Sequence, residues 1–359
     1  MTIENFSIEY DAINSHNTFT NGDVINGRII VEVSKETKIQ SIVFIAQGKA
    51  RVCWHEYYGQ NNHRIIWADE EYYKVKHHIL REARQDGTDV IGKGRHVFPF
   101  TFKIPDRKIP SSFNTCTGKI VHKLKAELKQ SMKLTKKVKT HFTFVSIADM
   151  DVPGLMEPQY GCKDKTIKVF GSGSVSLDVH TKKMGYEQGE AVQVTAEITN
   201  RSSRSVKPKF TLYEKLSFFA QGRRRVSTHV IHKEKVEPVD ASSGKVNVTK
   251  VINIPRELLP SILNCSIIKL EYRVKIQLNI KCASDPEIKL PIVILPEGLG
   301  TTQPPASAGA GFEAFGNPNQ PTWSTTPQPT ASKSGTPPPP YGAHEMYPTT
   351  SADKYETAW

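Results

Sequence analysis

The sequence predicts an all-β protein, built from two tandem β-sandwiches that are followed by a disordered, proline-rich tail. Short segments in which apolar and polar residues alternate recur along most of the chain, and turn signals separate them about every 8–12 residues. No segment has the apolar spacing of a confident long helix. From Leu299 onward the composition changes to mainly Pro, Ser, Thr, Gly, Ala and Gln, which predicts disorder for 299–359.

The first sandwich is predicted within residues 1–150. Asn5–Val33 reads as strand, turn and strand, because the apolar residues alternate and Asn21-Gly22-Asp23 interrupts them. Further strands are predicted at Ile39–Trp54, Trp67–Leu80, Val97–Ile104, Gly118–Leu128 and Lys139–Ile147. Arg81–Asp89 turns polar and is interpreted as a loop.

The second sandwich is predicted within residues 166–298, after a linker at 151–165 that contains Pro153-Gly154, Pro158 and Gly161. Its strands are predicted at Ile167–Phe170, Val175–His180, Ala191–Thr199, Lys209–Ala220, Arg225–Val236, Lys245–Ile254, Ser266–Ile280 and Glu287–Leu295.

The two halves also resemble each other locally. Both contain an aromatic residue, two further residues, a glycine and an acid before a strand, at Phe19–Val24 and at Tyr186–Ala191. Both contain Ile-Pro followed by Pro-Ser, at Ile104–Ser111 and at Ile254–Ser261. Glycine turns alone are common to many sandwiches, but the second coincidence favours a duplication.

Charge favours anionic partners. The 359 residues carry a net charge of +12. The tail has Lys333 and Lys354 against four acids (Glu313, Glu345, Asp353 and Glu356), a net of −2, so the folded part carries +14. Phosphorylated peptides, acidic tails of cargo proteins and the inner face of a membrane fit this charge, and a generally basic solvated surface is the alternative. No nucleic-acid module signature is present in the sequence, so a nucleic-acid partner is not expected.

Cysteine usage and the first residues predict a cytosolic protein. The five cysteines lie far apart and form no Cys-x-x-Cys, at Cys53, Cys116, Cys162, Cys265 and Cys282. This argues against a disulfide framework and a zinc site, and it fits a reducing compartment. The stretch MTIENFSIEY lacks the features of a signal peptide, and no apolar run approaches the length of a membrane span. We expect neither a metal nor a cofactor.

The motif with the clearest chemistry is Pro337–Tyr341, a run of four prolines before a tyrosine. Proline fixes φ near the polyproline II value, so the run is extended before any partner arrives. With about three residues per turn, Pro338 and Tyr341 share one face. This ridge suits the aromatic-lined grooves of SH3, WW and EVH1 domains, and Pro-Pro-x-Tyr is similar to the ligand motif of WW domains. A stiff spacer is the alternative.

Together these features resemble the arrestin superfamily, and the α-arrestin branch (arrestin-domain-containing proteins) in particular. The resemblance covers roughly residues 5–298, and its strongest part is Pro260–Tyr272. The segments that carry it are Asn21–Val24 with Gly27-Arg28, Gly48–Val52 with Trp54, Gly94–Phe102, Gly185–Glu190, Pro260–Tyr272 and Leu290–Ile294.

The resemblance implies the arrestin fold, two immunoglobulin-like sandwiches, and a non-enzymatic cytosolic adaptor. Such an adaptor binds membrane cargo, meaning receptors and transporters. Its tail binds the WW domains of HECT-type ubiquitin ligases, which leads to ubiquitination, endocytosis and endosomal sorting. Pro338, Pro339 and Tyr341 are the implied WW-binding residues. We expect the protein to be cytoplasmic and peripheral at the plasma membrane and endosomes. A cargo-binding or lipid-binding trafficking scaffold that acts without a ligase is the alternative.

The chain departs from the family pattern in two respects. Family members often carry two Pro-Pro-x-Tyr motifs, whereas Tyr347 here follows Glu345-Met346. A single motif lacks the avidity of two. A thioredoxin-binding relative uses a cysteine in a loop that we place near Glu237–Lys245, which contains none, so thioredoxin binding is not predicted.

Candidate enzyme sites are weak. His229 and His232 lie three residues apart, which on a strand places them on opposite faces and makes them poor joint metal ligands. No phosphate loop or nucleophile elbow appears in the sequence. A cysteine nucleophile is an open alternative, but a buried structural cysteine is the commoner role.

Two basic clusters are candidate contacts for an anionic partner. The first comprises Lys133, Lys136, Lys137 and Lys139, on a strand or its entry loop, and the second is Arg223-Arg224-Arg225 at an expected hairpin tip after Gly222. Acidic cargo or a phosphoinositide is the candidate ligand. A solvated loop is the alternative for each cluster.

Overall fold

A computed structural model describes residues 2–59, 62–80, 89–130, 133–147, 152–167, 173–281 and 283–298. The proposed motif residues Pro338, Pro339 and Tyr341 and the cysteine Cys282 lie outside this part of the chain. Every regular element within it is a β-strand, so the predicted all-β class is confirmed. None of the described residues forms a helix with the length and apolar character that a membrane crossing requires.

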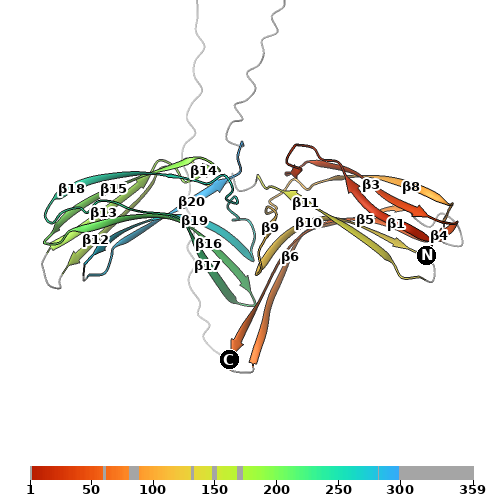
Figure 1. Ribbon diagram of the computed structural model, residues 1–359, viewed down its shortest axis with the longest axis horizontal. Helices are drawn as coiled ribbons and strands as arrows, with labels where there is room; N and C mark the ends of the chain where they lie inside the picture. The colour runs from red at the N-terminus through yellow and green to blue at the C-terminus, as the bar shows by residue number, and fades with distance from the viewer. Residues whose placement is uncertain are drawn as a thin grey trace, which may run out of the picture. The chain divides into compact units, whose positions relative to one another are not determined.

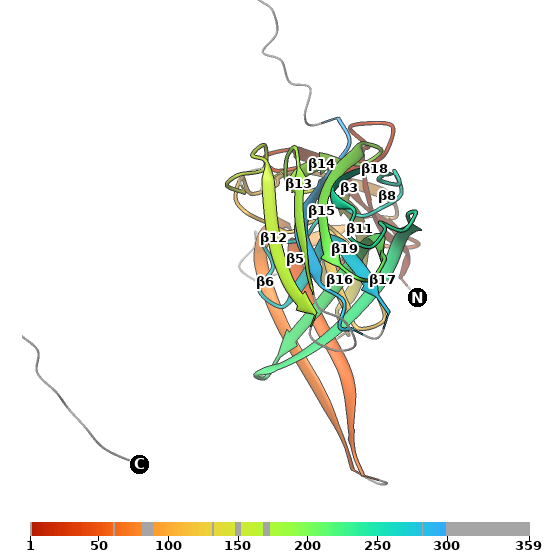
Figure 2. The same cartoon turned by 90° about the vertical axis from the view of Figure 1, so that its left-hand side faces the viewer.

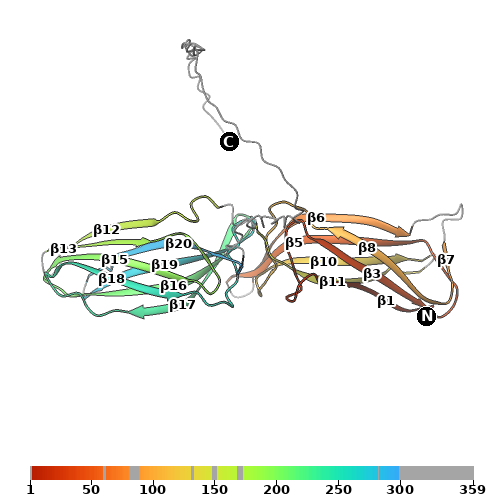
Figure 3. The same cartoon turned by 90° about the horizontal axis from the view of Figure 1, so that it is seen from above.

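The amino-terminal strands form two main sheets (Figures 1 and 3). The first sheet has the order β1-β3-β8, with β1 Ile3–Tyr10, β3 Val24–Val33 and β8 Gly94–Lys103. The second has the order β2-β11-β10-β5-β6, with β2 Thr18–Phe19, β11 Lys136–Phe144, β10 Gly118–Lys129, β5 Ser41–Tyr58 and β6 Asn62–Leu80. Short strands complete this half: β9 Phe113–Asn114 pairs with β10, and β4 Thr37–Ile39 pairs with β7 Asp89–Ile91.

The carboxy-terminal strands also form two sheets. One has the order β12-β13-β15-β18, with β12 Gln159–Ile167, β13 Gly173–Thr181, β15 Ala191–Ser202 and β18 Gly244–Asn253. The other has the order β14-β20-β19-β16-β17, with β14 Gly185–Glu187, β20 Glu287–Leu295, β19 Ile268–Ile280, β16 Val206–Ala220 and β17 Arg223–Lys235.

The expected linker at 151–165 is too long. Its second part belongs to β12, which pairs with β13 from Gln159 opposite Thr181 to Ile167 opposite Gly173. β12 is an edge strand, and none of its described side chains is buried. Because it lacks a buried face, the segment has no apolar alternation by which a strand is detected.

Alternation of buried and exposed side chains explains the longer strands. In β10 and β19 nearly every second side chain is buried, which is the pattern of a sheet with one face against a core. Phe210 and Tyr272 are among the largest fully buried side chains. The core of the second half continues to Trp54, Ile66 and Phe113 of the first half, so an apolar junction joins the two halves within one compact unit.

The internal repeat is visible in matching hydrogen bonds. Gly22 and Gly189 have φ of 80° and 83°, a left-handed conformation that favours glycine. Each glycine is followed by an acidic residue whose carboxylate accepts a hydrogen bond from a backbone N–H three residues before it. The Thr20 N–H donates to Asp23 at 2.7 Å, and the Glu187 N–H donates to Glu190 at 2.9 Å. The local equivalence expected from the sequence is therefore confirmed.

The serine of each Ile-Pro…Pro-Ser element also has the same role in both halves. Ser111 Oγ accepts a hydrogen bond from the backbone N–H of Ser146 at 2.9 Å, and Ser261 Oγ accepts one from Ile294 N–H at 2.9 Å. Both serines are buried. Each side chain therefore satisfies a backbone donor that would otherwise lose its hydrogen bond.

Replacing Ser261 by alanine should lower the free energy of unfolding by about 1–2 kcal/mol, because the buried Ile294 N–H loses its acceptor. Chemical denaturation measures the loss. Ser227→Ala, at an exposed position of β17, is the matched control and should change stability by less than about 0.5 kcal/mol. Equal stability of Ser261→Ala and the unmutated chain would contradict the assigned role.

Candidate functional site

A basic surface covers the solvent-facing side of the sheet formed by β5, β10 and β11. The strand register places Lys123 opposite His141 and Lys125 opposite Lys139, while Lys119 lies opposite Arg51. We call this surface the basic sheet face and define it by Lys49, Lys119, Lys123, Lys125, Lys139 and His141. These side chains share one face because alternate residues of a strand point the same way.

The cations of the basic sheet face disfavour one another's charge. The pKa of Lys123 is lowered, first by partial burial and then by Lys139, Lys125 and other lysines of the face. The pKa of His141 is lowered by burial and then by the same neighbouring lysines. Like charges on facing strands are destabilising, so an anion bound here would be stabilised by several cations at once.

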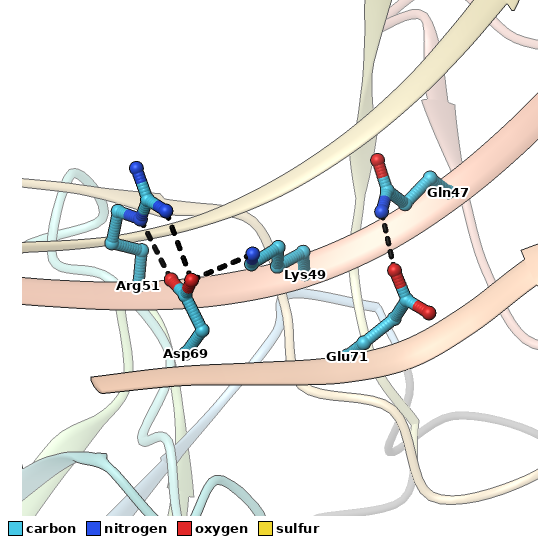
Figure 4. Close-up of polar contacts among 5 residues, drawn as sticks. All are labelled: Gln47, Lys49, Arg51, Asp69 and Glu71. Carbon is cyan, nitrogen blue, oxygen red and sulfur yellow. Dashed lines mark hydrogen bonds and ion pairs between the residues drawn. The ribbon is translucent and has the colours of Figure 1, made fainter.

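Carboxylates neutralise the two margins of the face. On the β5–β6 side, Asp69 accepts from Lys49 Nζ at 2.8 Å and from Arg51 Nε at 2.7 Å, as Figure 4 shows. The hydrogen bond from Arg51 is the main cause that lowers the pKa of Asp69 to about 2. On the other side, Glu127 pairs with Lys125, and Lys137 Nζ lies 3.8 Å away.

The centre of the face keeps its positive charge. Among the described residues, Lys119, Lys123 and Lys139 form no ion pair. Of these three, Lys119 lines a hollow of about 560 Å³, together with His141 and Asn114. Two basic residues of the face therefore border a recess.

Only part of the first predicted basic cluster belongs to this face. Lys139 lies on it, and Lys137 stands at its margin beside Glu127. Lys136 donates instead to the carbonyl of Ile3 at 3.0 Å, and Lys133 donates to Thr2 Oγ1 at 3.2 Å. Sequence reasoning missed Lys119, Lys123 and Lys125, although their alternation along β10 places them on one face.

The second predicted cluster follows a hairpin tip, as expected, because Gln221 and Gly222 have φ of 52° and 71°. Its three arginines do not act together. Arg223 pairs with Glu56 of β5. Arg224 donates to Ser217 Oγ at 2.9 Å and lies 5.3 Å from the centre of the Phe219 ring. The Arg225 side chain forms neither a hydrogen bond nor an ion pair within the described part of the chain.

Specific polar contacts accompany the apolar junction of the two halves. Glu70 accepts from the backbone N–H of Ser266 at 3.0 Å and from its hydroxyl at 2.6 Å. Tyr72 donates its hydroxyl to Cys265 Sγ at 3.1 Å. Burial raises the pKa of the Cys265 thiol, so Cys265 is a structural residue rather than a reactive one.

The expected orientation of His229 and His232 is wrong. Between Leu212 and Tyr213 of β16 the register shifts, so β17 carries one extra residue. His229 lies opposite Glu214 and His232 opposite Leu212, which places both histidines on the same face. Each has its own glutamate, Glu214 at 4.0 Å and Glu234 at 3.7 Å. Within the described residues, no three His, Cys, Asp or Glu side chains are grouped for a metal ion.

The fold and these surfaces define a class: a two-sandwich β-protein with a basic sheet face. Two family models match nearly all of the described body. The model for the arrestin amino-terminal domain matches residues 6–151, and the model for the arrestin (or S-antigen) carboxy-terminal domain matches residues 171–298. The chain therefore belongs to the arrestin family.

Similar curated proteins include arrestin domain-containing proteins. It is 27% identical over 287 residues to mouse arrestin domain-containing protein 4, covering 78% of this chain and 69% of that protein. The human form is 27% identical over 283 residues, covering 77% and 68%. Human thioredoxin-interacting protein is 24% identical over 298 residues, covering 81% and 74%.

Proposed function

We propose that the protein is a non-enzymatic adaptor that links membrane cargo to WW-domain ubiquitin ligases of the HECT type. In this function the arrestin body binds cytoplasmic tails of receptors or transporters, and the tail binds the ligase. Ubiquitination then directs the cargo into endocytosis and endosomal sorting. The adaptor acts in the cytoplasm, peripherally at the plasma membrane and endosomes, and it requires no cofactor.

The observation that carries the proposal is a Pro-Pro-x-Tyr sequence, Pro338 to Tyr341, on the same chain as an arrestin body. The motif supplies an aromatic anchor on a proline ridge, which suits a WW-domain groove. The basic sheet face, with Lys119, Lys123 and Lys139, supplies a surface for acidic or phosphorylated cargo segments. An anionic membrane surface is a further ligand that this charge favours.

A second candidate function is a cargo-binding or lipid-binding trafficking scaffold that acts without a ligase. The basic sheet face favours it, because that face is complete without the tail. Deleting 299–359 separates the two functions. Cargo turnover that is unchanged by the deletion supports the scaffold, whereas its loss supports the ligase adaptor.

Replacing Tyr341 by alanine should weaken binding to a WW-domain ligase about 30-fold or more, because an aromatic anchor is lost from its groove. The measurement is titration of purified WW domains against the full chain. Tyr347→Ala is the matched control, since this tyrosine lacks preceding prolines, and its affinity should equal that of the unmutated chain. The proposal fails if Tyr341→Ala binds as tightly as the control.

A further inference from the structure

Among the described strands, β17 is an unpaired sheet edge of the second sandwich. It pairs with β16 on one side and ends the five-stranded sheet on the other, as Figure 2 illustrates for the β16–β17 hairpin. Its 13 residues are almost all exposed. An edge strand presents a row of free backbone N–H and C=O groups, which can pair with another extended chain.

The first part of β17 offers apolar side chains beside that edge. Val226, Thr228 and Val230 lie opposite Ser217, Lys215 and Tyr213, so the three share one face. Val226 is 46% exposed and Val230 is 51% exposed. β-Branched side chains at alternate positions are the partners that an added strand packs against.

The second part of β17 is strongly cationic. Lys235 lies directly opposite Lys209 of β16, and Lys233 lies opposite Thr211 of β16. On the other side of β16, Thr211 lies opposite Lys275 of β19. We call Lys209, Lys233 and Lys235 the lysine cluster. Among the described residues these three form no ion pair. The pKa of Lys209 is lowered, first by burial and then by Lys233 and Lys275, and the nearby Asp285 carboxylate opposes this only in part.

The single acid of β17 does not relieve this charge. Glu234 pairs with Lys250 of β18 at 2.6 Å and with His232 at 3.7 Å. Glu234 is adjacent to Lys233 and Lys235 in the strand, so it points to the other face. The cluster therefore retains like charges that oppose one another across the sheet, which is a destabilising arrangement.

Protection of the edge against aggregation accounts for Lys233 and Lys235, because lysines on an edge strand discourage edge pairing. It does not account for Lys209, which lies on β16, away from the edge. A second copy of the chain is also disfavoured as the occupant, because two cationic edges would repel each other. The charge instead complements a segment that carries carboxylates.

We propose that the edge of β17 binds an extended acidic peptide of a partner protein by strand addition. The peptide backbone pairs with β17, its apolar side chains contact Val226 and Val230, and its carboxylates face the lysine cluster. The inference goes beyond the proposed adaptor function, since it requires neither the tail nor a ligase. It defines a peptide site on a different sandwich from the basic sheet face.

The test is fluorescence anisotropy of the full chain with labelled synthetic peptides of about eight residues, the reach of one strand. One peptide has two aspartates followed by alternating valine and threonine, and another has the reverse order, so that both strand directions are sampled. We expect saturable binding of one of them, weakened by added salt. The same peptides with asparagine for aspartate should bind about tenfold more weakly.

Variants locate the site. Lys233→Glu with Lys235→Glu should weaken binding about tenfold or more, because two attractions become repulsions. Lys163→Glu with Lys165→Glu is the matched control, since it makes the same change on β12, the edge strand of the other sheet. Circular dichroism verifies that both variants are folded. Equal peptide affinity of the two double variants overturns the proposal.

Hydrogen exchange distinguishes strand addition from charge attraction alone. Bound peptide should slow exchange of β17 amides and leave β12 amides unchanged. Protection of β1, β6 or the basic sheet face instead would place the peptide elsewhere and overturn the proposal.

Two further results would also overturn the proposal: dimerisation through β17, and binding to phosphatidylserine vesicles without peptide binding. Tyr341 takes no part in peptide binding at β17. A negative result in this test is therefore distinguishable from a negative result in the ligase-binding test.

Discussion

Replacing Gly48 by valine should destabilise the amino-terminal sandwich by about 3 kcal/mol or more. Gly48 of β5 lies between Tyr73 of β6 and His122 of β10, opposite both. The Tyr73 ring crosses over the glycine, so that its hydroxyl reaches His122 Nδ1 at 3.0 Å. A Cβ at position 48 would lie 2.4 Å from the nearest ring atom of Tyr73.

The ring has no free space to move into, because Tyr73 and His122 are both buried. Any side chain at Gly48 therefore displaces the ring and breaks the hydrogen bond, which combines overpacking with an unsatisfied buried group. Chemical denaturation measures the loss. Gly92→Val is the matched control, since a Cβ at Gly92 would meet nothing within 4 Å. Similar midpoints for the two variants would contradict this account of Gly48.

Stability should also fall as the pH is lowered from about 6.5 to about 4. His122 Nε2 lies 3.1 Å from the carbonyl of Pro110. A carbonyl only accepts, so Nε2 carries the proton and Nδ1 accepts from the Tyr73 hydroxyl. Burial lowers the pKa of His122 to about 4 from its ordinary value of 6.5. The native state therefore holds the neutral imidazole.

Below pH 6.5 the unfolded chain binds a proton at this histidine that the native state does not bind. The free energy of unfolding therefore decreases as pH falls, and the loss from this group is complete near pH 4, at about 3 kcal/mol. Unfolding curves of the unmutated chain and of His122→Gln at several pH values measure the effect. His122→Gln should show a shallower slope, whereas His16→Gln, at an exposed position, should keep the full slope. Equal slopes for all three proteins would show that His122 does not carry the effect.

The sequence predicts the strands whose one face is buried. β10 and β19 alternate cleanly, and the matching turns at Gly22 and Gly189 have the left-handed φ that their glycines indicate. The serines of the two Pro-Ser pairs, Ser111 and Ser261, have equivalent bonds. At these positions the local conformational propensity, the apolar pattern and the tertiary packing all favour the same structure, so the sequence alone predicts it.

Features that depend on neighbouring strands are not predictable from one segment. The edge strand β12 lacks a buried face, and the extra residue of β17 appears only when its register with β16 is known. The same limit applies to the charges. In the sequence, Arg223 and Arg224 resemble a surface cluster. In the structure, Arg223 forms an ion pair with Glu56, and Arg224 donates a hydrogen bond to Ser217. Lys119, Lys123 and Lys139 gather only when β10 and β11 pair.

Proximity labelling in cells tests the adaptor account most directly, with the labelling enzyme fused to the amino terminus of the unmutated chain, Tyr341→Ala or Tyr347→Ala. The account predicts that the unmutated chain and Tyr347→Ala label both membrane receptors or transporters and WW-domain ubiquitin ligases. Tyr341→Ala should keep the membrane proteins and lose the ligases, because the body still binds cargo. Ligases labelled equally by Tyr341→Ala, or no membrane proteins labelled by any of the three, would contradict the account.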